Sequence, residues 1–309
     1  MISVVIPTYK RRQTVGRAIE SALGQTLAPA EVIVVDDASG DGTAEWIARA
    51  HPGVKLIALA SNRGAAAARN AALAVASGDV VAFLDSDDWW EPGYLASITA
   101  AFDRTPGAVM AVCDVHMVLN YGPQPTSYVQ ACRPNPAYPS LAHNLLLDNF
   151  ITTMSCVAVK RDAIARAGLL DERLRVVHDK EWYLRLARLG GVACTGETLV
   201  WRTIADDNLV ADLRPFLADQ FRFLDRFFDT PAGAGLSSLR WRARARMLEG
   251  FAYMAQGRAQ YAAAAQYLLR AFAASCRDFH PQFALLVRSL AAQRGALRAS
   301  AAAAFARMK

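Results

Sequence analysis

The chain has 309 residues, of which 53% are hydrophobic and 20% are charged, and its formal net charge is +6. This length allows one large domain with a smaller one, and the composition excludes a disordered or collagen-like chain. No apolar stretch approaches the roughly 20 residues that span a bilayer, and the first basic cluster follows the first apolar run, unlike a secretory signal. The five cysteines are scattered without a CxxC pair. We therefore expect a cytoplasmic protein with reduced thiols and no zinc site.

Short β-type runs alternate with helical periods over the first part of the chain. The expected strands are residues 3–7, 31–36, 54–60 and 80–85, and the expected helices between them are residues 14–23, 42–50 and 65–76. Because the strands are apolar on both faces and the helices have about ten residues, the pattern indicates βαβ units around a parallel sheet. The fold class is therefore predicted to be α/β.

The pattern changes along the rest of the chain. The expected elements are helices near residues 94–102 and 180–189, strands at 109–115, 156–160 and 198–202, and an irregular proline-rich loop at 120–140. From Pro215 onward β-type runs end, and Ala, Arg, Leu and Phe recur at helical spacing. The stretch Phe251–Phe272 is similar to one tetratricopeptide unit, which predicts a helical hairpin but no solenoid. We expect an α/β domain of residues 1–213 and a helical, basic, Ala/Arg-rich accessory region of residues 214–309.

The positive charge is concentrated near the C-terminal end. Residues 206–309 contain 15 Lys or Arg and 8 Asp or Glu, whereas residues 1–205 contain 19 and 20. A basic region suits nucleic acid, anionic lipid or an acidic substrate, but arginine-rich helix faces in contact with solvent give the same pattern. Of the specific partners we favour peripheral contact with an anionic membrane, and we expect no nucleic acid partner.

Polar clusters follow the expected strands, and a fourth lies on a neighbouring helix. They are Pro7-Thr8-Tyr9, Asp36-Asp37, Asp85-Ser86-Asp87-Asp88 and Arg69-Asn70. Ligands of open parallel sheets bind in the crevice outside the carboxyl ends of the strands, which makes these clusters candidate site residues. No GxGxxG motif follows the first strand and the chain has no GxxxxGK(S/T) motif, so a dinucleotide fold and a P-loop are disfavoured.

Three carboxylates lie within four positions, at Asp85, Asp87 and Asp88. Neighbouring carboxylates repel one another, and a hard divalent cation with oxygen ligands would turn that repulsion into attraction. A cation bridging to phosphates is therefore the first hypothesis. The alternative is that Asp87 or Asp88 caps a helix that begins near Glu91. For Asp37, a contact to a base or ribose competes with capping the following helix or shaping the turn.

Five segments of the chain resemble family 2 glycosyltransferases, which have the GT-A fold. They are VVIPTYKRRQTVGRAIESALGQTL, EVIVVDDASGDGT, NRGAAAARNAAL, GDVVAFLDSDDWWEPGYL and GLLDERLRVVHDKEWYLRLARLG. Together they cover most of residues 2–203, in order and at ordinary spacing. The resemblance does not extend to the helical region.

The resemblance implies a role for each matching residue. Pro7, Thr8 and Tyr9 would border the nucleobase, Asp37 would contact the uracil or ribose, and Arg69 would lie near the base and diphosphate. The family's DxD motif is matched by Asp85, Ser86 and Asp87. By this resemblance Asp85 would face the ribose, and Asp87 would bind the metal, Mn²⁺ or Mg²⁺. Asp85 and Asp88 are further candidate metal ligands. Asp179 matches the catalytic base.

The sequence also departs from the family pattern. His178 stands where an acidic residue is usual, and neither a histidine nor QxxRW follows the last expected strand. Asp206, Asp207 or Asn208 would be substitutes for such a ligand, or part of a solvated loop. Trp89, Trp90 and Trp182 are candidates for stacking on sugar rings, although large aromatics beside a helix start are also typical of the core.

The resulting prediction is a metal-dependent, inverting glycosyltransferase. It would move one sugar from a nucleotide sugar, a UDP-sugar by preference, to a glycan or lipid-linked acceptor of a cell-envelope or capsule polysaccharide, at the inner face of the membrane. Two other hypotheses stay open: a nucleotidyltransferase that makes nucleotide sugars, and a non-catalytic binding protein on the same fold.

Overall fold

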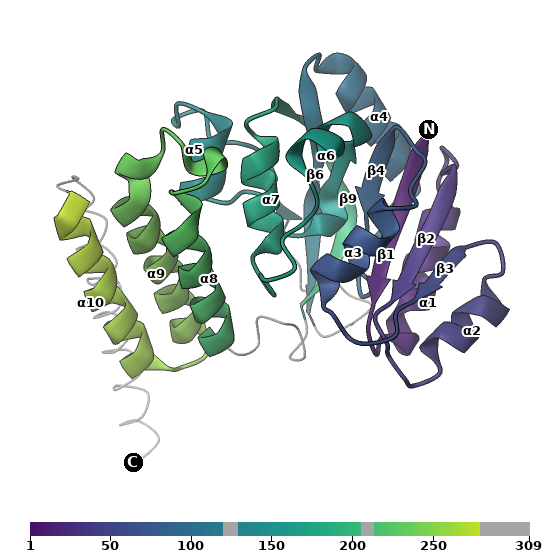
Figure 1. Ribbon diagram of the computed structural model, residues 1–309, viewed down its shortest axis with the longest axis horizontal. Helices are drawn as coiled ribbons and strands as arrows, with labels where there is room; N and C mark the ends of the chain where they lie inside the picture. The colour runs from purple at the N-terminus through teal and green to yellow at the C-terminus, as the bar shows by residue number, and fades with distance from the viewer. Residues whose placement is uncertain (120–128, 205–212, 279–309) are drawn as a thin grey trace, which may run out of the picture. The chain divides into compact units, whose positions relative to one another are not determined.

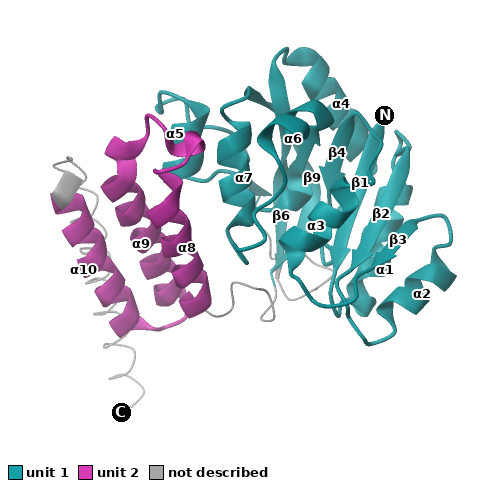
Figure 2. Cartoon of the chain, viewed as in Figure 1, with its two compact units in different colours: residues 1–212 teal, residues 213–309 magenta. Residues whose placement is uncertain are grey.

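The computed structural model describes residues 1–119, 129–204 and 213–278 (Figure 1). The chain divides into two compact units, Met1–Asp212 and Leu213–Lys309 (Figure 2). The first unit contains a nine-stranded sheet in the order β3-β2-β1-β4-β8-β6-β9-β5, with β7 paired to β6. Its helices flank this sheet, which makes the unit a mixed α/β structure.

One half of the sheet is parallel, as the sequence predicts. Its strands are β1 (Ile2–Thr8), β2 (Glu31–Asp36), β3 (Lys55–Ala58) and β4 (Val80–Phe83), and the connecting helices are α1 (Arg12–Leu23), α2 (Thr43–Ala50) and α3 (Ala65–Leu73). All residues of β1 are buried, and α1 has a buried apolar stripe of Val15, Ala18, Ile19 and Ala22. This pattern explains why the helix packs on the sheet. Because these strands are parallel, their carboxyl ends lie at one edge of the sheet.

The other half of the sheet is mixed. It contains β5 (Trp89–Trp90), β6 (Ala108–Leu119), β7 (Val129–Gln130), β8 (Val157–Lys160) and β9 (Gly191–Ile204). Strand β8 runs antiparallel to both β4 and β6, β6 runs parallel to β9, and β5 runs antiparallel to β9. Its helical segments are α4 (Tyr94–Arg104), α5 (Leu141–Leu147), the short 3₁₀ segment η1 (Met154–Cys156), α6 (Arg161–Ala167) and α7 (His178–Leu186).

Four short elements are missing from the sequence prediction, namely β5, β7, α5 and α6; β7 lies within the predicted irregular loop of residues 120–140. Helix α5 has only seven residues, too few for a helical period to be seen, and it is fixed by Ser140, whose Oγ accepts a hydrogen bond from His143 N. Strand β9 begins at Gly191, seven residues before the predicted start. Its first half contains two glycines, a threonine and a glutamate and is largely exposed, so an apolar run does not mark it.

The second unit contains the helices α8 (Leu213–Phe227), α9 (Arg240–Gly257) and α10 (Tyr261–Asp278), with two 3₁₀ turns at Pro231–Gly233 and Ser237–Leu239. Helices α9 and α10 form the predicted hairpin, whose contact is built from Phe251, Ala252, Ala255, Ala264 and Leu268 among others. Several arginines pair with acids of the same unit, at Arg240–Asp229, Arg244–Asp225 and Arg246–Glu249. None of the helices described here has the length and hydropathy that crossing a bilayer requires.

Candidate active site

The loop that follows β4 lies beside α3 and α7, and Arg69 connects the three. Its Nη2 donates to Asp85 Oδ1 at 2.5 Å, and its Nη1 lies 2.8 Å from His178 Nε2. The Arg69 side chain is only 5% exposed. Since a guanidinium can only donate, Nε2 of His178 accepts, and the ring is neutral with its proton on Nδ1. A neutral imidazole thus occupies the place where the family usually has an acid.

The small side chains of α3 allow this arrangement. The buried residues of α3 are Ala66, Ala67, Ala68, Arg69, Asn70 and Ala72. Because most of these buried side chains are alanines, α3 lies close to the elements around it. Arg69 can therefore reach the loop after β4 from this buried helix. The adjacent Asn70 exchanges hydrogen bonds with the backbone of Leu170, at 2.9 and 3.0 Å, and thereby holds the segment that leads to α7.

Asp88 is a buried carboxylate whose two oxygens are both hydrogen-bonded. Its Oδ1 accepts from Thr203 N at 2.8 Å, and its Oδ2 accepts from Ser155 Oγ at 2.5 Å. The residue is 2% exposed, and burial, followed by the charges of Asp87 and Asp85, raises the pKa of Asp88 well above its usual value. These contacts make Asp88 a poor candidate for direct metal ligation, although the sequence places it among the possible ligands.

Asp87 has the weakest protein partners of the three acids. The nearest cation is Arg11, whose Nη2 lies 3.9 Å from Asp87 Oδ2, and the Asp87 side chain is 18% exposed. Its backbone oxygen, in contrast, accepts from Thr203 Oγ1 at 2.6 Å and from Arg17 Nη2 at 3.3 Å. Burial, with the charge of Asp85, raises the pKa of Asp87 to about 6. The backbone of Asp87 is therefore held by hydrogen bonds, whereas its carboxylate has only a long ion pair, to Arg11, among the described residues.

Asp179 lies in the first turn of α7, next to His178. Its Oδ1 accepts from Lys180 N at 2.6 Å. Burial raises the pKa of Asp179; the charge of Asp85 adds to this effect, while the Lys180 N–H and the charge of Arg69 oppose it. Asp85, Arg69, His178 and Asp179 are therefore electrostatic neighbours, contributed by α3, the loop after β4, and α7. The structure thus brings together Arg69 and Asp85, which the sequence assigns to the donor, and Asp179, which it assigns to the base.

The ends of β1 and β2 lie side by side. Asp37 N donates to Thr8 O at 2.9 Å, and Lys10 N donates to Ser39 Oγ at 2.8 Å. Pro7 pairs with Val35 in the parallel ladder, Thr8 is buried, and Tyr9 is 42% exposed. Oγ1 of Thr8 is buried without a hydrogen-bond partner among the described residues. A buried hydroxyl that is unsatisfied in this way is uncommon in folded proteins.

Asp37 forms a bridge to α3. Its carboxylate accepts from Arg63 N at 2.8 Å and from Gly64 N at 2.7 Å. Gly64, with φ of 91°, is the N-cap residue of α3 and has no side chain to satisfy these donors. The suggestion that Asp37 caps the helix after β2 is wrong, because Asp41 Oδ1 accepts from Thr43 N there. Asp37 instead supports the start of the helix that carries Arg69.

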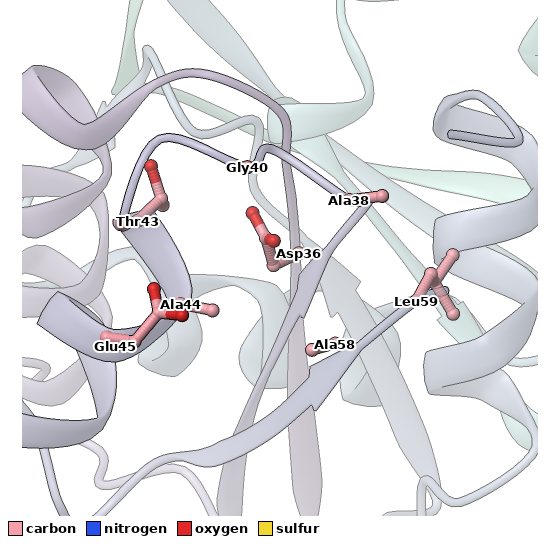
Figure 3. A pocket seen from close by; sticks show the side chains of 9 residues that line it. Asp36, Ala38, Gly40, Thr43, Ala44, Glu45, Ala58 and Leu59 are labelled. Atoms are coloured by element: carbon pink, nitrogen blue, oxygen red, sulfur yellow. The ribbon is translucent and has the colours of Figure 1, made fainter. Parts of the chain in front are cut away.

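A pocket of about 350 Å³ lies beside Asp36, between the start of α2 and the end of β3 (Figure 3). Its lining includes Gly40, Thr43 and Leu59. The Asp36 carboxylate itself accepts from both the backbone N and the Oγ of Ser39, which shapes the turn after β2. None of the residues that the resemblance selects lines this pocket.

Other expectations from the sequence are corrected by the structure. Helix α4 begins at Tyr94 with Gly93 as its N-cap and has no side-chain cap, so neither Asp87 nor Asp88 serves as one. Trp182 and Trp90 are buried. Trp89 stacks on Trp201 at 5.6 Å and has the Arg17 guanidinium 3.5 Å from its ring centre. The faces of these rings are occupied by the protein. Ser86 is buried, and Asp206, Asp207 and Asn208 lie outside the described residues.

Several residues of the site are not selected by any sequence motif. They are Arg11, Arg17, Thr153, Ser155 and Thr203. Hydroxyl and arginine side chains are common on any surface, and these come from α1, the turn before β8, and β9, far from the acids in sequence. Only the topology, which pairs β4 with β8 and β5 with β9, brings them to the acids.

The oxygen-rich acids suit a hard divalent cation. Within the described ranges, no group of three or more His, Cys, Asp or Glu side chains is arranged to hold a metal ion by itself. Mg²⁺ and similar ions usually bind through one or two carboxylates plus substrate phosphates and water, so a single carboxylate is sufficient protein ligation. Asp87 fits that requirement best, because its pKa is raised and the nearest cation among its described contacts, Arg11, lies 3.9 Å from its carboxylate.

The Arg69 ion pair gives a first prediction, on stability. Arg69→Met should lower the free energy of unfolding by about 3 kcal/mol, because it leaves Asp85 without its cation in a largely buried place. As a matched control, Arg63→Met removes the ion pair between Arg63 and Glu172, whose side chains are 55% and 37% exposed. This variant should change the free energy of unfolding by less than about 1 kcal/mol. Urea unfolding of both variants measures the difference, and equal effects would contradict a structural role for the Arg69 bridge.

Solved structures of glycosyltransferases share this fold. One is Staphylococcus aureus TarS (residues 1–349) in complex with UDP-GlcNAc, with a TM-score of 0.64 and 17% identity, covering 87% of this chain and 81% of that one. Another is the mannosyltransferase PcManGT of Pyrobaculum calidifontis in complex with GDP-Man and Mn²⁺, with a TM-score of 0.59 and 20% identity, covering 94% and 79%. The fold is therefore that of the GT-A glycosyltransferases.

The family follows from the sequence comparison. The model of Glycosyl transferase family 2 matches residues 3–168, more than half of the chain, and the chain belongs to this family. It is 42% identical over 118 residues to the succinoglycan biosynthesis protein ExoO of Rhizobium meliloti, covering 38% of this chain and 34% of that protein. It is also 41% identical over 92 residues to the Escherichia coli UDP-Glc:alpha-D-GlcNAc-diphosphoundecaprenol beta-1,3-glucosyltransferase WfaP, covering 29% and 36%.

The matches to curated relatives are partial. The chain spans about a third of the length of ExoO and WfaP, and 62% of an uncharacterized glycosyltransferase of Haemophilus influenzae, to which it is 28% identical over 190 residues, or 60% of this chain.

Proposed function

We propose that the protein is a metal-dependent, inverting glycosyltransferase that moves a single sugar from a nucleotide sugar to a glycan or lipid-linked acceptor. The observation that carries this proposal is the convergence of Asp85, Arg69 and Asp179 in one electrostatic cluster, with Asp87 two residues from Asp85. Inverting transfer is one displacement at the anomeric carbon. It requires a base for the acceptor and charge stabilisation for the leaving nucleoside diphosphate.

Asp179 is the proposed base. Burial raises its pKa, which makes the ionised carboxylate a stronger acceptor for the proton of an attacking hydroxyl. The neutral His178 and the Lys180 N–H fix the start of α7 beside Arg69. In this proposal the bond from the acceptor oxygen to the anomeric carbon forms as the bond to the diphosphate breaks, and Asp179 receives the proton.

Asp87 is the proposed metal ligand, and Asp85, held by Arg69, is assigned to the ribose of the donor. Mn²⁺ or Mg²⁺ bound at Asp87 would neutralise the negative charge that develops on the leaving diphosphate, a contribution of several kcal/mol in other enzymes. Pro7, Thr8, Tyr9, Ser86 and Asp37 complete the assignment as residues that border the nucleotide.

The activities named for the relatives support a donor and an acceptor class. WfaP uses a UDP-sugar and a diphosphoundecaprenol-linked acceptor, ExoO is a succinoglycan biosynthesis protein, and TarS is solved with UDP-GlcNAc. We therefore favour a UDP-sugar and a lipid-linked or polysaccharide acceptor in envelope or capsule biosynthesis. Residues 1–213 would form the catalytic domain. The basic helical region from residue 214 would act as an accessory part that contacts the anionic inner face of the membrane from the cytoplasm.

Product analysis tests the reaction class. Incubation with a panel of UDP-sugars, Mn²⁺ and a diphosphoundecaprenol-linked sugar should release UDP in proportion to glycosylated acceptor. A nucleotidyltransferase would instead release pyrophosphate from UTP and a sugar phosphate. A protein without catalytic function would release neither while still binding a partner. Release of pyrophosphate alone would overturn the proposal; a thermal-shift screen of nucleotide sugars with and without metal selects the donor to use.

A further inference from the structure

Two hydroxyl side chains lie between Asp85 and Asp88, outside every motif of the sequence. Thr153 Oγ1 lies 3.1 Å from Asp85 Oδ2 and 3.3 Å from Asp88 Oδ2. Ser155 Oγ donates to Asp88 Oδ2 at 2.5 Å and accepts from Asp85 N at 3.0 Å. Thr153 is 6% exposed and Ser155 is fully buried. Both belong to the turn formed by η1, which precedes β8.

These hydroxyls, with Arg69 and one amide, occupy the carboxyl oxygens of two acids. Asp85 receives the Arg69 guanidinium on Oδ1 and the Thr153 hydroxyl on Oδ2. Asp88 receives the Thr203 amide on Oδ1 and the Ser155 hydroxyl on Oδ2. Hydrogen bonds to ionised groups are about twice as strong as neutral ones, and they matter most where water is excluded. No comparable set of donors reaches the Asp87 carboxylate among the described contacts, where Arg11 at 3.9 Å is the nearest cation.

We propose that Thr153 and Ser155 are positioning residues that hold Asp85 and Asp88 away from the cation and so leave Asp87 as its protein ligand. Ser155 fixes the backbone of the loop at Asp85 N, two residues before Asp87, and the side chain of Asp88, one residue after Asp87. The direction in which the loop projects Asp87 therefore depends on this turn. The proposal rests on the proposed metal-dependent function and adds residues that neither the family motifs nor the resemblance selects.

Thr153 also has an ordinary structural role, which the experiment must separate. It is the N-cap of η1, and its side chain accepts from Ser155 N. Thr153→Val keeps the shape but removes the hydroxyl, whereas Thr153→Ser keeps the hydroxyl and removes a methyl group. Ser155→Ala leaves intact the cap bond from Ser155 N to Thr153 and removes the contacts of Ser155 Oγ to Asp88, to Asp85 N and to Thr153 Oγ1. The three variants together distinguish the hydroxyl from packing and from the cap.

The experiment is calorimetric titration of UDP into the full chain at a series of Mn²⁺ concentrations, with thermal unfolding in EDTA as a check of the fold. Ser155→Ala and Thr153→Val should each raise the Mn²⁺ concentration for half-maximal UDP binding by about tenfold or more. Thr153→Ser should stay within about threefold of the wild type. With a saturating donor, kcat should fall less than kcat/KM, because the loss lies in the donor–metal complex.

Each outcome decides the proposal. An unchanged or lower Mn²⁺ requirement in Ser155→Ala would overturn it, as would equal losses in Thr153→Val and Thr153→Ser. If Thr153→Val fails to fold while Thr153→Ser folds, the hydroxyl is still required, and Ser155→Ala alone then decides. If Ser155→Ala fails to fold in EDTA, the contact is structural and the proposal is rejected. If the wild type binds UDP without any dependence on Mn²⁺, this result contradicts the proposed metal-dependent function, and it is thereby distinguished from a failure of the positioning role.

Discussion

Asp179→Asn is expected to lower kcat for sugar transfer by about 10²–10⁴-fold, the range typical for loss of a positioned general base. The amide keeps the size of the side chain and can still accept from Lys180 N, so the start of α7 should be preserved. It cannot take the proton of the acceptor hydroxyl. Initial rates of UDP release at saturating donor and acceptor measure the effect.

The matching control is Asp162→Asn. Asp162 is also an acid in the first turn of a helix, α6, but it is exposed and has no contact with the site. Its change should alter kcat by less than about twofold. Donor binding by Asp179→Asn, measured by calorimetry, should stay close to that of the wild type. If Asp179→Asn retains most of its kcat, the assignment of the base is wrong.

Asp87→Asn is expected to abolish measurable transfer and yet to stabilise the metal-free fold. In the absence of a cation, burial and the charge of Asp85 raise the pKa of Asp87 from 3.8 to about 6. The ionised carboxylate therefore destabilises the folded state at neutral pH. A shift of about two units corresponds to about 3 kcal/mol at most, because each unit is about 1.4 kcal/mol. We expect a gain of about 1–3 kcal/mol for the variant in EDTA at pH 7.5.

The sign of the pH dependence follows from the raised pKa. An acid whose pKa is higher in the folded state favours folding when protonated, and this contribution is lost as the pH rises through about 6. The gain in the free energy of unfolding of Asp87→Asn over the wild type should therefore be largest at pH 7.5, smaller at pH 5, and nearly zero near pH 4. Urea unfolding at these three pH values tests it. A variant that is less stable than the wild type at pH 7.5 would show that Asp87 has protein partners strong enough to replace a cation.

The parallel half of the sheet is predictable from the sequence because its signals are local and consistent. β2 has the predicted bounds, and α1, α2 and α4 agree within two residues at each end. In contrast, β5 consists of Trp89 and Trp90, and it exists only because it pairs with β9 more than a hundred residues away. Such pairing depends on topology, which a local pattern does not contain.

The candidate site is predictable only in part. The motifs select Asp85, Asp87, Arg69 and Asp179, and the structure places these residues in one cluster. The argument that the crowded acids need a dication is weakest for Asp85 and Asp88, because Arg69 balances Asp85, and hydroxyl and amide groups satisfy Asp88. The hydroxyl and amide donors to Asp88 come from η1, which precedes β8, and from β9, and no spacing rule connects these segments to the acids. These donors can be identified only from the folded structure.

The central claim is that Asp87 binds the cation that holds the donor diphosphate. Its most direct test is calorimetric titration of UDP into wild type and Asp87→Asn, with Mn²⁺ and with EDTA. The wild type should bind UDP about 100-fold more tightly with Mn²⁺, equivalent to about 2.7 kcal/mol, and Asp87→Asn should bind equally weakly in both conditions. Retention of the full Mn²⁺ effect by Asp87→Asn would contradict the claim.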